Sequence, residues 1–218
     1  MLLQKIALGL IIVGIGICGY CIARGSSQKT YTTTVPRKYG AIVRLTNKGR
    51  TFCSGTVVSP SLIVTAAHCV LKETFAGVRL TDEDIEIRPV DNTDLRIEAS
   101  PISAVVQMDT AILHGDFSDF EIKEIITDPA ILTHIRQHNT KFISCGYPLH
   151  GDLYCNTTTD PIPYNFAWKV SGVLLPGMSG GPTMLEDGTI VAINVAVEGK
   201  FSIVSPTYNA LSSIEAKK

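Results

Sequence analysis

The sequence predicts an all-β protein whose antiparallel strands close into barrels. From about residue 39 onward, short apolar or alternating runs recur, and Gly, Pro, Asn and Asp separate them, which is the pattern of an antiparallel barrel. The 218 residues leave room for one substantial domain or for two small barrels that share a cleft. Hydrophobic residues make up 45% and charged residues 18%, which favours a packed core over disorder. The formal net charge of −1, without a Lys/Arg cluster, argues against nucleic-acid binding.

The first 24 residues contain an apolar run, residues 6–23, with a basic residue on each flank. As a helix this run would extend about 27 Å, close to the hydrocarbon thickness of a bilayer. We therefore predict that residues 1–24 form a transmembrane anchor. Cleavage after Ala23 as a secretory signal is the alternative, because Cys21 and Ala23 are small enough for a cleavage site. Residues 25–37 are small, polar and Thr-rich, which indicates a linker.

The predicted strands form two groups on either side of a connecting stretch. Residues 116–139 lack alternation, and residues 121–126 within them are predicted to form a short helix. A second short helix, at 208–216, is predicted to pack on the outside at the C-terminal end. The strands are predicted at 41–45, 51–58, 62–66, 85–90 and 102–106, and then at 141–145, 166–175, 189–196 and 201–204.

Three polar residues have the chemistry of a nucleophilic site. Ser179 lies in the run Gly-Met-Ser-Gly-Gly-Pro, and His68 lies in Thr-Ala-Ala-His-Cys. A serine hydroxyl is a poor nucleophile until a neighbouring imidazole accepts its proton. Asp109, next to an apolar strand-like run, is the candidate for orienting that imidazole, with Asp94 and Asp116 as rivals. The order His, Asp, Ser along the chain is one of several in which such triads occur.

These motifs resemble those of the trypsin-like (chymotrypsin-fold) serine proteases, over about residues 38 to 208. Asp109 has the Asp-x-Ala-x-Leu context of that family, which its rivals lack. The pattern is closest to bacterial high-temperature-requirement-type and glutamyl-endopeptidase-like members. The resemblance implies two antiparallel Greek-key β-barrels within a protease domain at 38–218. The N-terminal barrel, at 38–120, would carry His68 and Asp109, and the C-terminal barrel, at 136–208, would carry Ser179.

The resemblance also implies the roles of the glycine-rich run. The backbone N–H groups of Gly177 and Ser179 would form the oxyanion hole, and the mechanism would need no metal or cofactor. Digestive-type members place an aspartate directly before the nucleophile, where it pairs with a newly cut N-terminus. Here that residue is Met178, which carries no charge. We therefore expect the protein to lack this maturation switch.

The substrate pocket is expected to be apolar. The position six residues before the nucleophile, where family members that cleave after Lys or Arg carry an aspartate, is Val173. By resemblance to the high-temperature-requirement proteases, Asn194, Val195 and Ala196 would line the pocket and pair with the substrate backbone. With Leu174 at its edge, the pocket should accept small or medium apolar P1 side chains, P1 being the residue before the cut bond.

The resemblance further pairs Cys53 with Cys69 in the disulfide beneath the catalytic histidine, while Cys145 and Cys155 could bridge a second hairpin. Two disulfides favour an oxidising compartment and hence an exocytoplasmic domain. The basic residues that follow the apolar run favour the opposite orientation. Because long domains translocate with little regard to flanking charge, we give the cysteines more weight.

Three further patterns concern metal binding or modification. The acidic cluster at residues 82–86 could bind calcium, but a solvated hairpin tip also accounts for it. His134 and His138 have zinc-ligand spacing without a third ligand. Asn156 begins a glycosylation sequon. We therefore predict no metal site.

The sequence thus predicts a membrane-tethered serine endopeptidase that acts on peptide or protein substrates. The alternative is a binding module of the same fold in which catalysis has lapsed. Such modules usually lose a triad residue, and none is lost here.

Overall fold

The computed structural model describes residues 40–74, 77–81, 85–89, 94–138 and 141–209. Across these ranges, none of the helices has the length and apolar character needed to cross a membrane. The predicted anchor and linker lie outside the described residues. So does most of the predicted C-terminal helix, of which Tyr208 and Asn209 alone are described.

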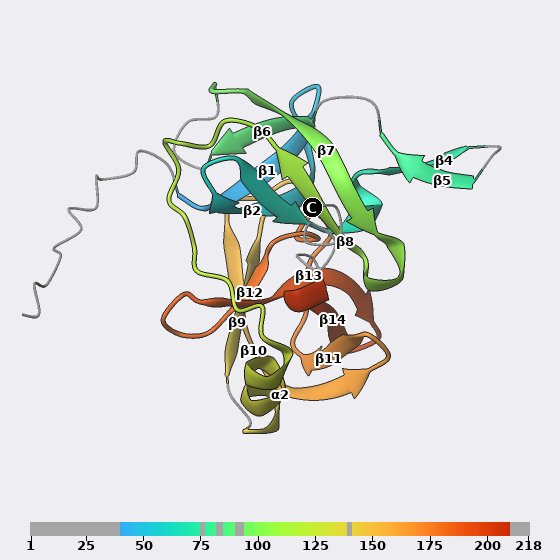
Figure 1. Cartoon of the computed structure of the whole chain (residues 1–218), viewed down its shortest axis with the longest axis vertical. Helices are drawn as coiled ribbons and strands as arrows, with labels where there is room; N and C mark the ends of the chain where they lie inside the picture. Colours follow the sequence, from blue (N-terminus) through green and yellow to red (C-terminus); the bar gives the residue numbers. More distant parts are fainter. Residues whose placement is uncertain (1–39, 75–76, 82–84, 90–93, 139–140, 210–218) are drawn as a thin grey trace, which may run out of the picture. The chain divides into compact units, whose positions relative to one another are not determined.

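Two closed antiparallel barrels, each of six strands, make up the described domain (Figure 1). Around each barrel, the first three strands are neighbours in chain order, and the last three follow them in reverse chain order. This is a Greek-key arrangement. The predicted all-β class and the two barrels are therefore confirmed. In hydrogen-bonded order the first barrel contains β1 (Ile42–Asn47), β2 (Arg50–Ser59), β3 (Leu62–Thr65), β8 (Thr110–His114), β7 (Ile97–Val105) and β6 (Ile85–Pro89). The second contains β9 (Phe142–Gly146), β10 (Tyr154–Tyr164), β11 (Ala167–Ser171), β14 (Phe201–Pro206), β13 (Ile190–Glu198) and β12 (Pro182–Met184).

Apolar side chains at alternating positions along the strands form the core of the first barrel. Val43 and Leu45 of β1 are fully buried and belong to one cluster with Ile87 of β6. The turn from β1 to β2 consists of Lys48 and Gly49, with φ of 48° and 76°. Positive φ at both central residues is the signature of a type I′ turn, which matches the twist of the two strands it joins.

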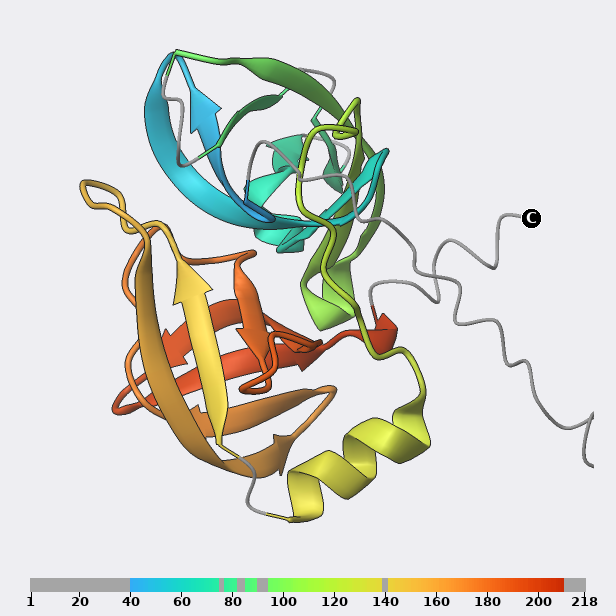
Figure 2. The ribbon, with the colours of Figure 1, turned by 90° about the vertical axis from the view of Figure 1, so that its left-hand side faces the viewer.

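The chain between the barrels contains one helix, at a different place from the one predicted. Residues 121–126 are not helical, because Ile125 and Ile126 lie in extended backbone beside Ile190 of β13. The helix is α2 (Pro129–Gln137), at the far end of the second barrel in Figure 2. It begins where Asp128 accepts a 2.7 Å hydrogen bond from the backbone of Ala130, an N-cap followed by proline at the first helical position.

The sequence pattern indicated β8 only as the strand-like run next to Asp109, missed the short strand β12, and missed two longer strand regions. The first is the hairpin of β4 (Leu71–Thr74) and β5 (Gly77–Leu80), which stands outside both barrels. The second is β10, whose Asn, Asp and Pro residues have low strand propensity. The pairing of β10 with β11 shifts register next to Asp160, which has φ of 54°. A bulge at this point allows the strand to continue through residues that a regular ladder would exclude.

Candidate active site

Strand pairing brings His68 and Asp109 together. Thr65 at the end of β3 pairs with Ala111 of β8. His68 follows in a single 3-10 turn, η1 (Ala67–Cys69), and Asp109 precedes β8 after a second such turn, η2 (Val106–Met108). Because β3 and β8 are antiparallel neighbours, both residues emerge at the same end of the pair. Asp109 has φ of 47°, in the left-handed region.

The Asp109 carboxylate binds His68 at two points. Its Oδ2 lies 2.7 Å from His68 Nδ1, and its Oδ1 accepts a 2.8 Å hydrogen bond from the His68 backbone N–H. An ionised carboxylate only accepts hydrogen bonds, so Nδ1 carries the ring proton and Nε2 is left as the basic nitrogen. The Asp109 hydrogen bond raises the pKa of His68, partial burial opposes this, and the negative charge of Asp109 adds to the increase.

Ser179 lies in a loop that only glycines allow. Gly177 and Gly180 have φ of 97° and 85°, which L side chains rarely adopt. A Cβ atom on Gly180 would lie 2.1 Å from Thr65 Oγ1 and 2.2 Å from the carbonyl oxygen of Ser54. Both of these neighbours belong to the first barrel, so the nucleophile loop is packed against it at backbone distance.

Two amides of this loop point to no protein acceptor. The N–H groups of Met178, Gly180 and Gly181 each donate to a backbone carbonyl. Within the part of the chain that the structure describes, those of Gly177 and Ser179 make no hydrogen bond. Buried backbone donors are nearly always paired, so two unpaired N–H groups beside a serine hydroxyl are what an oxyanion hole requires.

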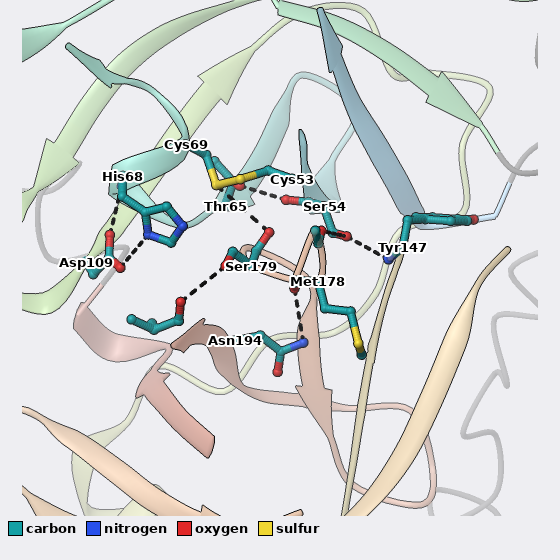
Figure 3. The surroundings of a disulfide bond; sticks show 12 residues. Cys53, Ser54, Thr65, His68, Cys69, Asp109, Tyr147, Met178, Ser179 and Asn194 are labelled. Atoms are coloured by element: carbon teal, nitrogen blue, oxygen red, sulfur yellow. Dashed lines mark hydrogen bonds and ion pairs between the residues drawn. A yellow bond between two sulfur atoms is a disulfide. The ribbon is translucent and has the colours of Figure 1, made fainter. Parts of the chain in front are cut away.

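The Ser179 hydroxyl is bonded to a carbonyl and not to the histidine. Its Oγ donates to Val195 O at 3.2 Å. This carbonyl is available because the pairing of β13 with β14 shifts register at Val195. No hydrogen bond joins Ser179 to His68 among the described residues. The two nevertheless flank the Cys69 sulfur, which lies within 4.8 Å of a ring nitrogen of His68 and 3.9 Å from Ser179 O (Figure 3).

Both suggested cysteine pairs are bonded. Cys53 of β2 is joined to Cys69 of η1, and Cys145 is joined to Cys155 across β9 and β10. The first disulfide ties the turn that carries His68 to the strand beside it. The two cysteine pairings are therefore confirmed.

A cavity of about 370 Å³ lies beside Ser179. Of the residues that the structure describes, none with a charged side chain lines it. A larger cavity of about 770 Å³ opens in the first barrel around Phe52 and Lys72, but neither His68 nor Ser179 lines it. We take the smaller cavity as the candidate substrate pocket because it adjoins the hydroxyl. Its wall consists of Leu174, Leu175, Pro176, Ser179, Val195, Ala196 and Val197.

Two residues expected in the pocket lie elsewhere. Val173 does not line the cavity, and its side chain is largely exposed. Asn194 is fully buried, and its Nδ2 donates to Cys145 O at 2.8 Å and to Met178 O at 3.4 Å. Its Oδ1 accepts from the hydroxyl of Thr183 at 2.8 Å. Asn194 therefore supports the nucleophile loop through its side chain and is not among the residues that line this cavity.

One residue that contacts the site was not predicted from the sequence. Ser54 is fully buried on β2, and its hydroxyl donates to Gly177 O at 2.9 Å. A small polar residue directly after a half-cystine in an apolar strand was the available signal.

Among the described residues, the histidine pair suggested as a metal site gains no third ligand. Residues 82–84 of the acidic cluster lie outside the described residues, and Glu86 forms ion pairs with Arg88 and Arg96. In the described ranges, His134 and His138 stack at 4.0 Å between ring centroids without joining a three-residue cluster. The one such cluster there combines His68 with Cys53 and Cys69, whose sulfurs are already joined to each other.

Comparison with known proteins agrees with this architecture. The trypsin family model matches residues 30–120. No curated protein matches the sequence. The Rv3671c protease from M. tuberculosis is similar in its active form, with a TM-score of 0.60 and 18% identity, covering 81% of this chain and 80% of that one. Its inactive form gives the same TM-score and identity, with coverage of 81% and 88%. The serine endoprotease from Yersinia pestis has a TM-score of 0.61 at 18% identity, covering 81% of this chain and 62% of that one. The resemblance to chymotrypsin-fold serine proteases is confirmed at the level of the fold.

Proposed function

We propose that this chain, which has the fold of the trypsin-like serine proteases, is a serine endopeptidase. The observation that carries the proposal is the His68–Asp109 pair, held at 2.7 Å, beside a serine loop with two amides that find no acceptor among the described residues. These are the base, its orienting group, the nucleophile and the oxyanion donors that acyl transfer requires.

The reaction proceeds in two halves. Ser179 turns its hydroxyl from Val195 O to His68 and attacks the scissile carbonyl carbon, while His68 Nε2 takes the hydroxyl proton. Asp109 holds the ring and stabilises its charged form. The developing oxyanion accepts from the N–H groups of Gly177 and Ser179. His68 then protonates the leaving amine, and the C–N bond breaks to leave an acyl-enzyme. Water attacks the acyl-enzyme by the same route and releases Ser179.

The walls of the pocket define the proposed specificity. Leu174, Val195 and Ala196 offer apolar contacts to a P1 side chain. A charged P1 residue would lose its hydration without gaining an ionic partner, which costs several kcal/mol. We therefore propose small or medium apolar P1 residues.

The proposed setting is a membrane surface. Residues 6–23 are apolar and long enough to anchor the chain, and two disulfides suit an oxidising compartment. The proposal is therefore an anchored protease domain on the exocytoplasmic side, or a secreted one if the N-terminal segment is cleaved.

A binding module without activity is the second candidate, and one observation favours it. The Ser179 hydroxyl donates to Val195 O and not to His68. A fluorophosphonate probe separates the two candidates, because only an activated serine attacks its phosphorus atom. We expect labelling of the wild-type chain and none of Ser179→Ala. An unlabelled but folded wild-type chain would establish the binding module instead.

A further inference from the structure

Ser54 uses all of its polar groups within a small region between the two barrels. It is fully buried on β2. Its backbone N–H donates to Ser179 O at 2.8 Å, and its carbonyl accepts from the Thr65 hydroxyl at 2.7 Å. The first bond already joins the strand to the nucleophile loop.

The Ser54 hydroxyl extends this link to Gly177. It donates to Gly177 O at 2.9 Å and accepts from the backbone N–H of Tyr147 at 2.8 Å. A serine hydroxyl has one donor and two acceptor sites, so its single donor is committed to the loop. Ser54 therefore holds the carbonyls of Gly177 and Ser179, the two residues whose amides are the proposed oxyanion donors.

The loop needs such a restraint from outside. Gly177, with φ of 97°, is in a conformation that only glycine adopts readily, and glycine has many other conformations available. The neighbouring Met178 is fully buried and uncharged, so no ion pair can fix the loop at that position. A Cβ on Gly177 would lie 2.6 Å from Tyr147 O, so the segment that donates to Ser54 also packs directly behind the glycine.

We propose that Ser54 is the positioning residue of the oxyanion hole. Its hydroxyl holds the carbonyl of the Gly177–Met178 peptide from the opposite barrel and so restrains the Gly177 backbone. The Gly177 N–H, which lies in the preceding peptide, is thereby kept pointing at the oxygen that becomes negative. This proposal rests on the proposed function. Among the described residues, the Ser54 hydroxyl bonds to neither member of the His68–Asp109 pair, and the bond from the Ser54 backbone N–H to Ser179 O does not need the hydroxyl. Removal of the hydroxyl should therefore weaken the transition state and leave substrate binding and the base unchanged.

The test compares Ser54→Ala with the wild-type chain on a peptide substrate. We expect kcat to fall roughly 10- to 100-fold, less than the 10²- to 10³-fold that follows loss of an oxyanion donor itself. KM and the pH midpoint of kcat/KM should stay within experimental error. A peptide aldehyde, whose adduct places an oxyanion in the hole, should lose affinity by the same factor as kcat. The amine product, which has no negative oxygen to place in the hole, should lose none.

Thr207→Val is the matched control. Thr207 is also fully buried, and its hydroxyl bonds to the carbonyls of Ile126 and Val191, away from the site. We expect this variant to lose stability without the loss of kcat or aldehyde affinity. Thermal unfolding of both variants shows whether the chains are folded at the assay temperature.

Each remaining outcome decides the proposal. If the wild-type chain turns over and folded Ser54→Ala keeps kcat within about threefold, Ser54 is not a positioning residue, although the proposed function stands. Equal losses in kcat and in product affinity would assign it a general structural role. Should Ser54→Ala not fold, Ser54→Gly removes the same hydroxyl, and failure of both to fold would also contradict the proposal. A folded wild-type chain without turnover would instead contradict the proposed function.

Discussion

Asp109 binds His68 through both of its oxygens, one at the ring Nδ1 and one at the backbone N–H. The two bonds fix the position of the ring relative to its own main chain. A histidine held in this way has one tautomer and little rotation, and its Nε2 faces away from the carboxylate. The pKa of this ring therefore reports directly on the pair.

The first prediction concerns pH. The Asp109 hydrogen bond, and secondly its charge, raise the pKa of His68 above the ordinary 6.5. The base must be neutral to accept the Ser179 proton, so kcat/KM should rise with pH and reach half its plateau above 6.5. In Asp109→Asn the midpoint should move to lower pH, and kcat should fall roughly 10⁴-fold because the tautomer is no longer fixed. An unchanged midpoint in Asp109→Asn would show that another group titrates.

The second prediction concerns the nucleophile. Ser179→Ala should lose about 10⁶-fold in kcat, and His68→Ala about as much, because each leaves the other without a partner. The double variant should be little slower than either single one. Single-turnover kinetics with an activated ester measures this. Additive losses in the double variant would mean that the two residues act separately.

The third prediction concerns the disulfide beside His68. Cys53→Ser/Cys69→Ser should lower the free energy of unfolding by about 3 kcal/mol, the chain-entropy value for a loop of 15 residues; the bond here joins residues 16 apart. Urea denaturation measures the change. Because Cys69 belongs to the same turn as His68, kcat should fall as well. Cys145→Ser/Cys155→Ser is the control, since this pair lies on β9 and β10 and should affect stability more than kcat.

The fourth prediction concerns the pocket. A peptide library should show Val, Ala, Leu or Ile at P1 ahead of Lys, Arg, Asp or Glu. The preference among aliphatic residues should be graded, because one methylene is worth only about 1–3 kcal/mol. Ala196→Glu places a carboxylate in the wall and should raise kcat/KM for P1 Lys relative to P1 Leu. If the wild-type chain already prefers basic P1 residues, the cavity beside Ser179 is not the P1 site.

The fifth prediction concerns Asn194. In Asn194→Asp an oxygen replaces the donor that faces Cys145 O and Met178 O. We expect the free energy of unfolding to fall by roughly 3 kcal/mol, the upper range for an unsatisfied buried group. Asn156→Asp, on the partly exposed β10, should change it by less than about 0.5 kcal/mol. Equal effects of the two changes would mean that Asn194 does not anchor the loop.

The sequence predicted the features that depend on residues close together in the chain. Alternation located most barrel strands, and the sequence contexts of His68 and Asp109 indicated a pair that the structure joins. It could not predict β10, because its unfavourable residues are tolerated only through pairing on both sides. The helix lies at residues 129–137 and not at 121–126. Residues 124 and 126 instead form backbone hydrogen bonds with Ile190, the first residue of β13. Asn194 was assigned to the pocket by resemblance, and its bonds to Cys145 O and Met178 O could not be predicted because they join residues far apart in the chain.

The contacts of Thr65 and Ser54 with the serine loop have a consequence for biosynthesis. Both residues lie in the N-terminal barrel, which leaves the ribosome first, while Ser179 is made more than a hundred residues later. The second barrel could form its own strands, yet its loop would lack the surface that shapes it. Any proteolytic competence would therefore arise only at the last docking step, and a nascent or truncated chain would be inactive.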